Sequence, residues 1–354
     1  MTITIDCRMI NSSGIGVYLR GCLPYFLKSA DNFILIGDRE QLKSYSSDNV
    51  KIIDCKIKPF SIKETFFFPA SVLKQINKTS LFYSPFFNIP HGIKIPVYTT
   101  IHDIIFPDMP ELSSKAGLAA RMWFFRRSYK KSKKIFTVSR FSKSRIEHYL
   151  GSSKPVIVTH SAIQQTYLEY RENIKNIHKK DTIVFIGNIK KHKGLNCLLD
   201  AFLPAKNEGL PHKLIIIGSK ENFRTSDTGI LKKIESVGED FISFTGFISD
   251  DALMKCLSET SLLVQPSLYE GFCLPPLEAM ILGTNALISD IPVLKEIYAD
   301  YPVTFFKTGD SGDLKNKLTD ILLNKKASSP ALSHNMISKY TFDKTVSIIL
   351  KELE

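Results

Sequence analysis

Residues 182–203 read TIVFIGNIKKHKGLNCLLDAFL, in which an apolar run leads through a lysine-rich loop into a second apolar segment. We expect a strand over 182–186 and a helix over 195–203. The strand is continuously apolar rather than alternating, and such strands are typical of parallel sheets that are covered on both faces. This unit therefore indicates an α/β fold.

The same alternation of strand and helix runs through the rest of the chain. Further strands are expected at 3–6, 33–37, 51–54, 80–83, 96–101, 134–138, 155–159, 213–217, 241–244, 261–265 and 285–289, and helices at 17–29, 142–150 and 342–353. The polar stretch 169–180 (EYRENIKNIHKK) is expected to be a linker. We therefore predict two doubly wound, Rossmann-like domains, 1–168 and 181–339, whose parallel sheets face a central cleft.

Length and composition exclude several classes of protein. The chain has 354 residues, of which 44% are hydrophobic and 23% charged, as in ordinary globular proteins rather than disordered ones. No apolar run approaches the roughly 18 residues of a membrane-spanning helix, and no signal-peptide pattern opens the sequence. The six cysteines are scattered without a CxxC motif, which excludes a zinc cluster and indicates a reducing compartment, so we expect the cytosol.

The charge is unevenly distributed. Lys and Arg number 47 and Asp and Glu 35, a net charge of +12. Residues 1–180 hold 28 basic and 13 acidic residues, whereas residues 181–354 hold 19 and 22. The first half is thus expected to meet an anionic membrane, a phosphorylated substrate or nucleic acid, unless it simply has a solvated basic surface.

Several candidate functional residues lie close together in residues 266–283, PSLYEGFCLPPLEAMILG, directly after a predicted strand. Pro275 and Pro276 suit the first turn of a helix, so 271–274 should form a turn at a helix N-terminus, where backbone N–H groups favour a diphosphate. Glu270 and Glu278 flank this turn and are suited to accept hydrogen bonds from sugar hydroxyls. The alternative is that Glu270 caps the helix and Glu278 is merely exposed.

A second element, FIGNIKKHKG at 185–194, also follows a predicted strand. A lysine there is expected to neutralise phosphate charge, although a solvated basic loop is the common alternative. Both elements lie at carboxyl ends of strands, where open α/β sheets bind their ligands.

These motifs resemble glycosyltransferase family 4, the retaining GT-B enzymes that use nucleotide sugars. The segment SLYEGFCLPPLEAM is similar to the E-x7-E signature of this family. Other segments match in order: the glycine loop NSSGIGVY at 11–18, TIHD at 100–103, TVSRFS at 137–142, FIGNIKKHKGL at 185–195, GFISDDAL at 246–253 and SDIPVLKEI at 289–297. The resemblance spans nearly the whole chain and implies that the helix at about 340–354 packs back onto the first domain.

The resemblance also implies roles for residues of the second domain. Glu270 would contact the donor sugar and Glu278 the ribose, while backbone N–H groups of Gly271, Phe272, Cys273 and Leu274 would hold the diphosphate. Lys193 would neutralise the departing phosphates, with Asn188 and His192 standing where many members carry Arg. Phe247 and Ile248 would line the nucleobase pocket. Cys273 replaces the usual glycine, and we do not expect it to act as a nucleophile because no base lies at a recognisable spacing.

In the first domain, the resemblance implies that Gly14 and Gly16 let their loop approach the donor phosphates; a plain strand–helix turn is the alternative. His102 would lie near the donor sugar, unless it is a buried histidine satisfied by backbone groups. Asp103 would orient its segment or meet the acceptor. Retention is explained in this class by front-face attack, without a protein nucleophile. The sequence has no DxD motif, and we expect neither an essential metal nor another cofactor.

Residues 115–134, KAGLAARMWFFRRSYKKSKK, contain eight basic residues and no acidic one. Leu118, Met122, Phe125 and Tyr129 share one helical face, so this basic amphipathic helix is expected to lie on anionic lipid. The alternative is that the apolar stripe packs on its own sheet. Phe66, Phe67 and Phe68 are a second candidate for contact with lipid, unless they belong to the core. Nucleic acid is not expected as a partner because no binding motif accompanies the charge.

Together these features predict a hexosyltransferase, with mannose from GDP-mannose as the expected donor and a lipid-diphosphate-linked oligosaccharide of O-antigen, capsule or exopolysaccharide synthesis as acceptor. The protein would be peripheral on the inner face of the cytoplasmic membrane. A UDP-sugar or a dTDP- or GDP-deoxysugar transferase of the same fold is one alternative, and a non-catalytic nucleotide-sugar-binding relative is another.

Overall fold

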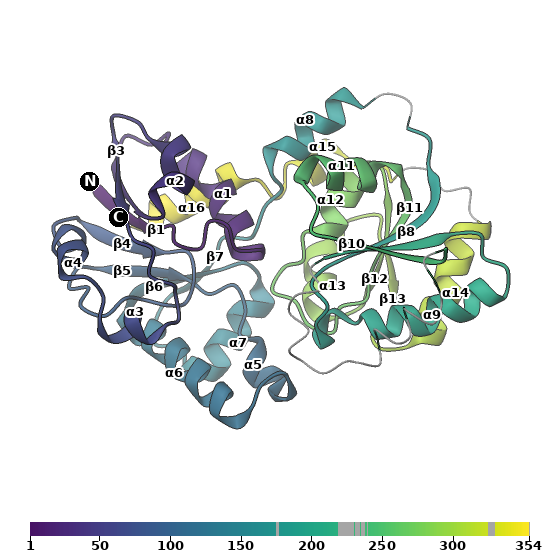
Figure 1. Ribbon diagram of the computed structural model, residues 1–354, viewed down its shortest axis with the longest axis horizontal. Coiled ribbons are helices and arrows are strands. Elements are labelled where there is room, and N and C mark those ends of the chain that lie inside the picture. Colours follow the sequence, from purple (N-terminus) through teal and green to yellow (C-terminus); the bar gives the residue numbers. More distant parts are fainter. Residues whose placement is uncertain are drawn as a thin grey trace. The chain divides into compact units, whose positions relative to one another are not determined.

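The computed structural model describes residues 1–174, 177–218, 230, 234, 238, 240–324 and 330–353. It divides into two α/β units (Figure 1). The first comprises Met1–Ala162 and Tyr340–Glu354, and the second Ile163–Lys339. The boundary therefore precedes the predicted one at 168. The predicted linker 169–180 is in part helix α8 (Gln165–Asn173) of the second unit, while its residues 175 and 176 lie outside the described residues.

The first unit is built on a seven-stranded parallel sheet in the order β3-β2-β1-β4-β5-β6-β7. Its strands are β1 (Thr2–Asp6), β2 (Asn32–Gly37), β3 (Val50–Asp54), β4 (Leu81–Ser84), β5 (Val97–Thr100), β6 (Ser132–Thr137) and β7 (Val156–Val158). Strand β1 is paired on both sides, and its residues Ile3–Asp6 are buried because both faces of the sheet are covered. This is the expected reason for a continuously apolar strand.

The helices of the first unit follow the strands in the usual alternation. They are α1 (Gly14–Phe26), α2 (Arg39–Leu42), η1 (Lys43–Tyr45), α3 (Ile62–Phe66), α4 (Ala70–Ile76), α5 (Ile105–Asp108), η2 (Pro110–Leu112), α6 (Lys115–Lys131), α7 (Arg140–Leu150) and α16 (Phe342–Leu353). Side-chain caps set several starts: Ser139 Oγ accepts a hydrogen bond from Ser142 N at 3.0 Å at the start of α7.

The second unit repeats the plan with a six-stranded parallel sheet, β10-β9-β8-β11-β12-β13. Its strands are β8 (Lys180–Ile186), β9 (Lys213–Ile217), β10 (Ile242–Gly246), β11 (Thr260–Gln265), β12 (Asn285–Ser289) and β13 (Thr304–Phe306). Besides α8, its helices are η3 (Lys191–Lys193), α9 (Leu195–Asn207), α11 (Asp250–Glu259), α12 (Pro275–Ile281), α13 (Pro292–Tyr298), α14 (Ser311–Thr319), η4 (Asp320–Asn324) and α15 (His334–Ile337). Helices α9 and α14 lie on one side of this sheet and α8, α11 and α12 on the other (Figure 1).

The two doubly wound parallel sheets confirm the predicted fold class. Strand β13 was not expected: it is only three residues long, and its first two are partly exposed, so it gives little apolar signal. The other predicted strands are present with small shifts at their ends.

The C-terminal helix α16 belongs to the first unit, where its yellow ribbon lies among the purple of α1 (Figure 1). Its Phe342 is buried beside Gly21 of α1, and an ideal Cβ on that glycine would lie 2.1 Å from the Phe342 ring. Lys134 Nζ lies 2.9 Å from Glu352 Oε2, and Thr345 Oγ1 donates to the Thr159 carbonyl at 3.1 Å. The last helix is therefore an integral part of this unit.

The basic segment 115–134 differs from the predicted amphipathic helix. Helix α6 ends at Lys131, and Lys133 and Lys134 belong to β6. The apolar stripe packs on its own unit: Met122, Phe125 and Tyr129 are buried in one core cluster with Ile101 and Ile135, and Leu118 lies against it. The stripe is thus not available to lipid, although Lys115, Arg126, Lys130 and Lys131 of the helix are exposed. Within the described ranges, no helix is long and apolar enough to cross a bilayer.

Candidate functional site

The candidate site lies at the carboxyl ends of β8 and β11, which are neighbours in the sheet of the second unit. From β8 the chain proceeds to β9 and β10 on one side, and from β11 to β12 and β13 on the other. Open α/β sheets generally bind their ligands at such a reversal of strand order. The loop after β8 carries Lys193, and the loop after β11 carries Glu270.

The structure brings these two predicted residues together. Lys193 Nζ lies 2.7 Å from Glu270 Oε1, with 23% and 10% of the side chains exposed. Ser267 Oγ donates to the same oxygen at 2.7 Å, and Gln265 Nε2 donates to Ser267 Oγ at 2.9 Å. Glu270 is therefore part of a hydrogen-bonded chain and not an exposed cap, and Lys193 is not in a freely solvated loop.

The loops are also joined through their backbones. Leu268 N donates to the His192 carbonyl at 2.7 Å. Gly194 has a φ of +70°, and a Cβ there would lie 1.8 Å from the Pro266 carbonyl oxygen. Only glycine allows this close approach. Gly194 therefore sets how near Lys193 comes to the loop of Glu270.

The side chain of His192 supplies no charge at neutral pH. Burial, reinforced by the adjacent Lys193, lowers the pKa of His192 to about 4. The positive charge beside Glu270 thus comes from Lys193. This agrees with the sequence analysis, in which His192 stands where many family members carry an arginine. The loop residue Asn188 is half-buried, and its carbonyl accepts a hydrogen bond from Lys190 N at 2.8 Å.

Residues 271–274 form the predicted turn, and α12 starts after it at Pro275 with proline in its first two positions. Cys273 adopts a φ of +72°, which L-residues other than glycine rarely adopt. Its carbonyl accepts a hydrogen bond from Tyr298 Oη of α13. Burial and the nearby Glu270 raise the pKa of the Cys273 thiol, so it stays protonated and is a poor nucleophile.

Glu278 lies inside α12 and is buried, with 8% of its surface exposed. Burial, together with Asp250, raises the pKa of Glu278 to about 7. A carboxyl group that is ionised at such a cost is typical of functional positions. Burial thus excludes the alternative of an exposed helix residue.

Phe247 and Ile248 follow β10 on the same unit. Phe247 is 89% exposed, and Ile248 is half-buried. An exposed aromatic side chain at a sheet edge has no packing role in its own unit.

The remaining predicted residues belong to the first unit. Gly14 is the first residue of α1, with open space at its Cβ position, whereas a Cβ on Gly16 would lie 2.5 Å from the Ile10 carbonyl oxygen. Asp103 Oδ1 accepts a hydrogen bond from Ile105 N at 3.2 Å, so it orients its own segment.

His102 lies with its Nε2 2.9 Å from the Pro85 carbonyl oxygen and its ring edge-to-face with Tyr18. Because a carbonyl only accepts, Nε2 carries the proton in this arrangement. Burial lowers the pKa of His102 to about 4, so the imidazole is neutral at pH 7. The backbone contact fits the alternative of a satisfied histidine, and it also fixes the ring.

Three polar residues of the site were not singled out from the sequence: Ser267, Gln265 and Tyr298. The sequence signal for Gln265 was an amide at the end of the apolar run of β11, and the structure shows that this amide is fully buried. Within the described part of the chain, its Oε1 has no hydrogen-bond partner. Such an orphaned acceptor beside Ser267 is typical of a site that a ligand or water completes.

A metal centre was not expected. Over residues 1–174, 177–218, 240–324 and 330–353, no group of three or more His, Cys, Asp or Glu side chains is placed to hold an ion.

Comparison with known proteins points to one family. Residues 167–340 match the family described as Glycosyl transferases group 1. The O-antigen chain mannosyltransferase B of Escherichia coli is 28% identical over 235 residues, which cover 63% of this chain and 60% of that protein. The O-antigen chain mannosyltransferase RfbU of Salmonella typhimurium is 24% identical over 255 residues, covering 69% and 65%. The matched regions thus span less than two thirds of these relatives' own lengths.

The solved structures agree on the fold. The crystal structure of Anabaena HepE in complex with UDP and glucose superposes with a TM-score of 0.72 at 16% identity, covering 100% of this chain and 99% of that one. The architecture is the GT-B fold, as the resemblance implied.

The left-handed backbone at Cys273 gives a test by substitution. We expect Cys273→Ala to be less stable than Cys273→Gly by about 1 kcal/mol, because both lack the thiol but only alanine bears the cost of a positive φ. Urea unfolding of the two variants measures the difference. Equal stability, or a more stable alanine variant, would contradict the assigned backbone conformation.

Glu278 gives a test by pH. The native protein binds this proton more tightly than the unfolded chain, whose Glu has the ordinary pKa of 4.5. The protonated carboxyl group of Glu278 therefore contributes to the stability of the native protein at low pH. This contribution is lost as the pH rises from 4.5 through about 7. We expect Glu278→Gln to gain roughly 1–3 kcal/mol relative to wild type between pH 5 and pH 8, measured by urea unfolding at both values. Parallel pH profiles for the two proteins would show that Glu278 titrates normally.

Proposed function

This chain belongs to the group 1 glycosyltransferases, and from that premise we propose that it transfers a hexose from a nucleotide sugar to a lipid-linked oligosaccharide with retention of anomeric configuration. The observation that carries the proposal is the Lys193–Glu270 pair at the carboxyl ends of β8 and β11. In this pair, Lys193 is a cation that can bind phosphate and Glu270 is a carboxylate that can accept hydrogen bonds from sugar hydroxyls. Both belong to one hydrogen-bonded chain.

The donor would enter by exchanging partners with this pair. Lys193 would turn from Glu270 to the diphosphate, and Glu270 would accept hydrogen bonds from the sugar hydroxyls while keeping Ser267. Backbone N–H groups of the turn Gly271, Phe272, Cys273 and Leu274 would add to the diphosphate contacts. Because Lys193 is mostly buried, its interaction with phosphate is less screened than at an open surface.

The transfer step needs no protein nucleophile. The bond between the anomeric carbon and the phosphate oxygen breaks, and the acceptor oxygen bonds to the same face of that carbon. The proton of the acceptor hydroxyl passes to the departing diphosphate. Lys193 stabilises the charge that grows on the diphosphate in the transition state, which is where an electrostatic contact accelerates a reaction.

The nucleoside would lie beyond the diphosphate. Glu278 would hold the ribose hydroxyls, and Phe247, with Ile248, would cover the base. Asn188 would contribute polar contacts to the phosphates. In the first unit, Gly14, Gly16 and His102 remain predicted donor contacts and Asp103 a predicted acceptor contact.

We propose mannose from GDP-mannose as the donor and an oligosaccharide on a lipid diphosphate as the acceptor. Two relatives named as O-antigen chain mannosyltransferases support this choice. Such an acceptor is held at a membrane, so the protein would work as a peripheral protein on the cytoplasmic side. The basic first half supports that location.

A UDP-hexose transferase is the second candidate. One observation favours it: the superposed Anabaena protein was solved with UDP and glucose. A binding protein without catalytic activity is an alternative of another class, and release of nucleoside diphosphate from a sugar nucleotide with a lipid extract excludes it.

The first test separates sugar contact from phosphate contact. In Glu270→Gln we expect turnover to fall at least a hundredfold, because a neutral amide holds the sugar less well in the transition state. Binding of nucleoside diphosphate should persist or tighten, since Lys193 is no longer neutralised. Lys193→Ala should lose both turnover and binding of nucleoside diphosphate. Nucleoside diphosphate release and calorimetric titration measure the two properties.

The matched control is Glu259→Gln, which breaks the exposed ion pair with Lys180 in the same unit, away from the site. It should leave turnover unchanged. Turnover of Glu270→Gln within a few-fold of wild type would remove Glu270 from the mechanism.

The second test identifies the nucleotide. A ligand that binds only the native protein raises its stability, by about 2.7 kcal/mol at a hundred times its Kd. We expect GDP to raise the midpoint of thermal unfolding by several degrees and UDP to raise it much less. Protection by UDP alone would establish the second candidate, and protection by neither would count against nucleotide-sugar binding.

A further inference from the structure

Residues 56–67 of the first unit, KIKPFSIKETFF, hold apolar side chains out in solvent. Ile62, Phe66 and Phe67 are 74%, 67% and 72% exposed, and Phe60 is 36% exposed. Ile62 and Phe66 are the two ends of α3. Neighbouring exposed large apolar residues of this kind are unusual on a soluble surface and mark an interaction site.

Buried ions fix the backbone of this segment. Arg8 Nη2 lies 2.5 Å from both Asp6 Oδ2 and Glu64 Oε1, and the Arg8 and Glu64 side chains are 2% and 0% exposed. Glu64 Oε2 accepts a hydrogen bond from Phe60 N at 2.6 Å and another from Asn88 Nδ2. Arg8 Nη1 donates to the Ile57 carbonyl at 3.3 Å. The apolar side chains are therefore presented by an anchored backbone and not by a loose loop.

The charge of the segment is positive on its outer side. Lys56, Lys58 and Lys63 are exposed, whereas Glu64, the only acidic residue among 56–67, points into the ion cluster. Within the described part of the chain, the ion pair of these lysines is that of Lys56 Nζ with Asp38 at 3.5 Å, and such an exposed pair contributes little.

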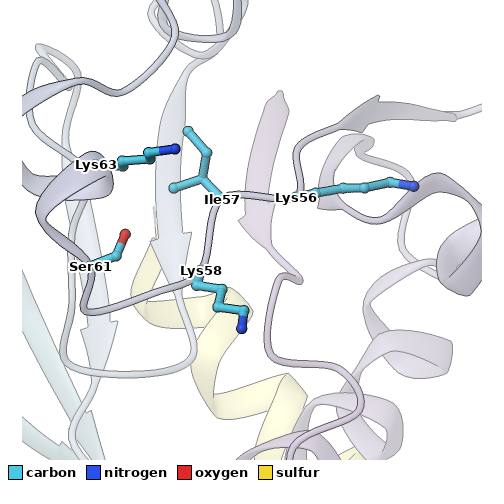
Figure 2. Close-up of a pocket in the computed structure, with 5 residues that line it drawn as sticks. All are labelled: Lys56, Ile57, Lys58, Ser61 and Lys63. Atoms are coloured by element: carbon cyan, nitrogen blue, oxygen red, sulfur yellow. The ribbon is translucent and has the colours of Figure 1, made fainter.

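The lysines surround a hollow of about 470 Å³ that is lined by Lys56, Ile57, Lys58, Ser61 and Lys63. Figure 2 shows the three ammonium groups pointing in different directions, with that of Lys56 away from those of Lys58 and Lys63. The Ser61 side chain accepts the N-cap hydrogen bond of α3 from Glu64 N, so its own hydroxyl hydrogen can be donated outward. Cations that point in different directions from one segment suit the separate phosphates of a headgroup layer better than one bound anion.

We infer that residues 56–67 are the docking surface for an anionic phospholipid bilayer, with Ile62, Phe66 and Phe67 entering the interface and the lysines binding lipid phosphates. Apolar side chains flanked by lysines are the combination that a headgroup boundary favours. The inference deepens the proposed function, on which it rests for its biological reason, since a lipid-linked acceptor requires the enzyme at a membrane.

The surface extends toward α6. The Phe60 ring lies 5.9 Å from the Phe124 ring, which lies 5.0 Å from the ring of Trp123, and Trp123 is 47% exposed. Helix α6 thus contributes an aromatic residue at the edge of this surface, although its apolar stripe is buried.

A second copy of this chain fits the surface less well. A symmetric dimer places the same patch on both partners, so Lys56, Lys58 and Lys63 would face their own counterparts. Like charges at an interface oppose association, whereas an anionic bilayer neutralises them.

Vesicle sedimentation tests the inference with the whole chain and without donor. Wild type should partition to vesicles of phosphatidylglycerol and phosphatidylcholine, more strongly at low salt, and weakly to phosphatidylcholine alone. Phe67→Ser should lower the partition coefficient roughly tenfold. The triple variant Lys56→Gln, Lys58→Gln, Lys63→Gln should lower it on the order of a hundredfold at low salt.

Matched controls separate this surface from general charge and apolarity. Phe247→Ser removes an aromatic residue of the second unit that is more exposed than Phe67, and Lys43→Gln, Lys51→Gln, Lys78→Gln removes three exposed charges elsewhere on the first unit. Both should partition like wild type. Calorimetric titration with nucleoside diphosphate should be unchanged in the segment variants, so a failure of vesicle binding is distinct from a failure of the proposed function.

Three results would overturn the inference. One is unchanged partitioning of the segment variants. Another is a loss of partitioning only when the charges of Lys130, Lys131 and Lys133 are removed, which would place the contact on α6 and β6. The third is a dimer in sedimentation velocity that dissociates in Phe67→Ser while wild type ignores vesicles.

Discussion

The ion pair of Lys193 with Glu270 depends on a constraint of topology. The two residues are far apart in sequence, but β8 and β11 are parallel neighbours, so the loops at their carboxyl ends emerge side by side. Gly194 permits the close approach of these loops, and the bond from Leu268 N to the His192 carbonyl fixes it. A mostly buried carboxylate is costly without a partner, and Lys193 supplies that partner to Glu270. The strand order thus places a cation and a carboxylate side by side at one edge of the sheet.

The two units use buried polar groups in different ways. In the first unit, Glu64 has Arg8, Asn88 and the Phe60 amide as partners, and these contacts hold the chain in place although burial still raises the pKa of Glu64. In the second, Gln265 keeps an acceptor unsatisfied and Glu278 is ionised only at the cost of a raised pKa. A buried group with several protein partners stabilises a shape, whereas a buried acceptor without a partner retains the capacity to bind a ligand. This contrast distinguishes anchoring clusters from binding sites in a single chain.

Local sequence was a good guide where one signal dominated. Continuous apolar runs located the strands, and the prolines at 275 and 276 located the start of α12. Local sequence did not predict the contacts of a side chain where these contacts depend on tertiary packing. The apolar stripe of α6 carried the same signal whether it met lipid or its own sheet, and only the packing of Phe125 against the core distinguished the two. The contact of Lys193 with Glu270 likewise required the strand order, and the inward direction of Glu64 required Arg8, neither of which a sequence window contains.

The membership of α16 in the first unit has a consequence for synthesis on the ribosome. The second unit is one continuous stretch and emerges before residue 340, so it can fold while the first still lacks its last helix. Synthesis of the chain from the end of the first segment at Ala162 to helix α16 takes on the order of ten to forty seconds at usual translation rates. During that time the groove of α1 beside Gly21, which Phe342 later fills, remains open to water and to other nascent chains. The first unit thus begins to emerge before the second unit and is completed after it.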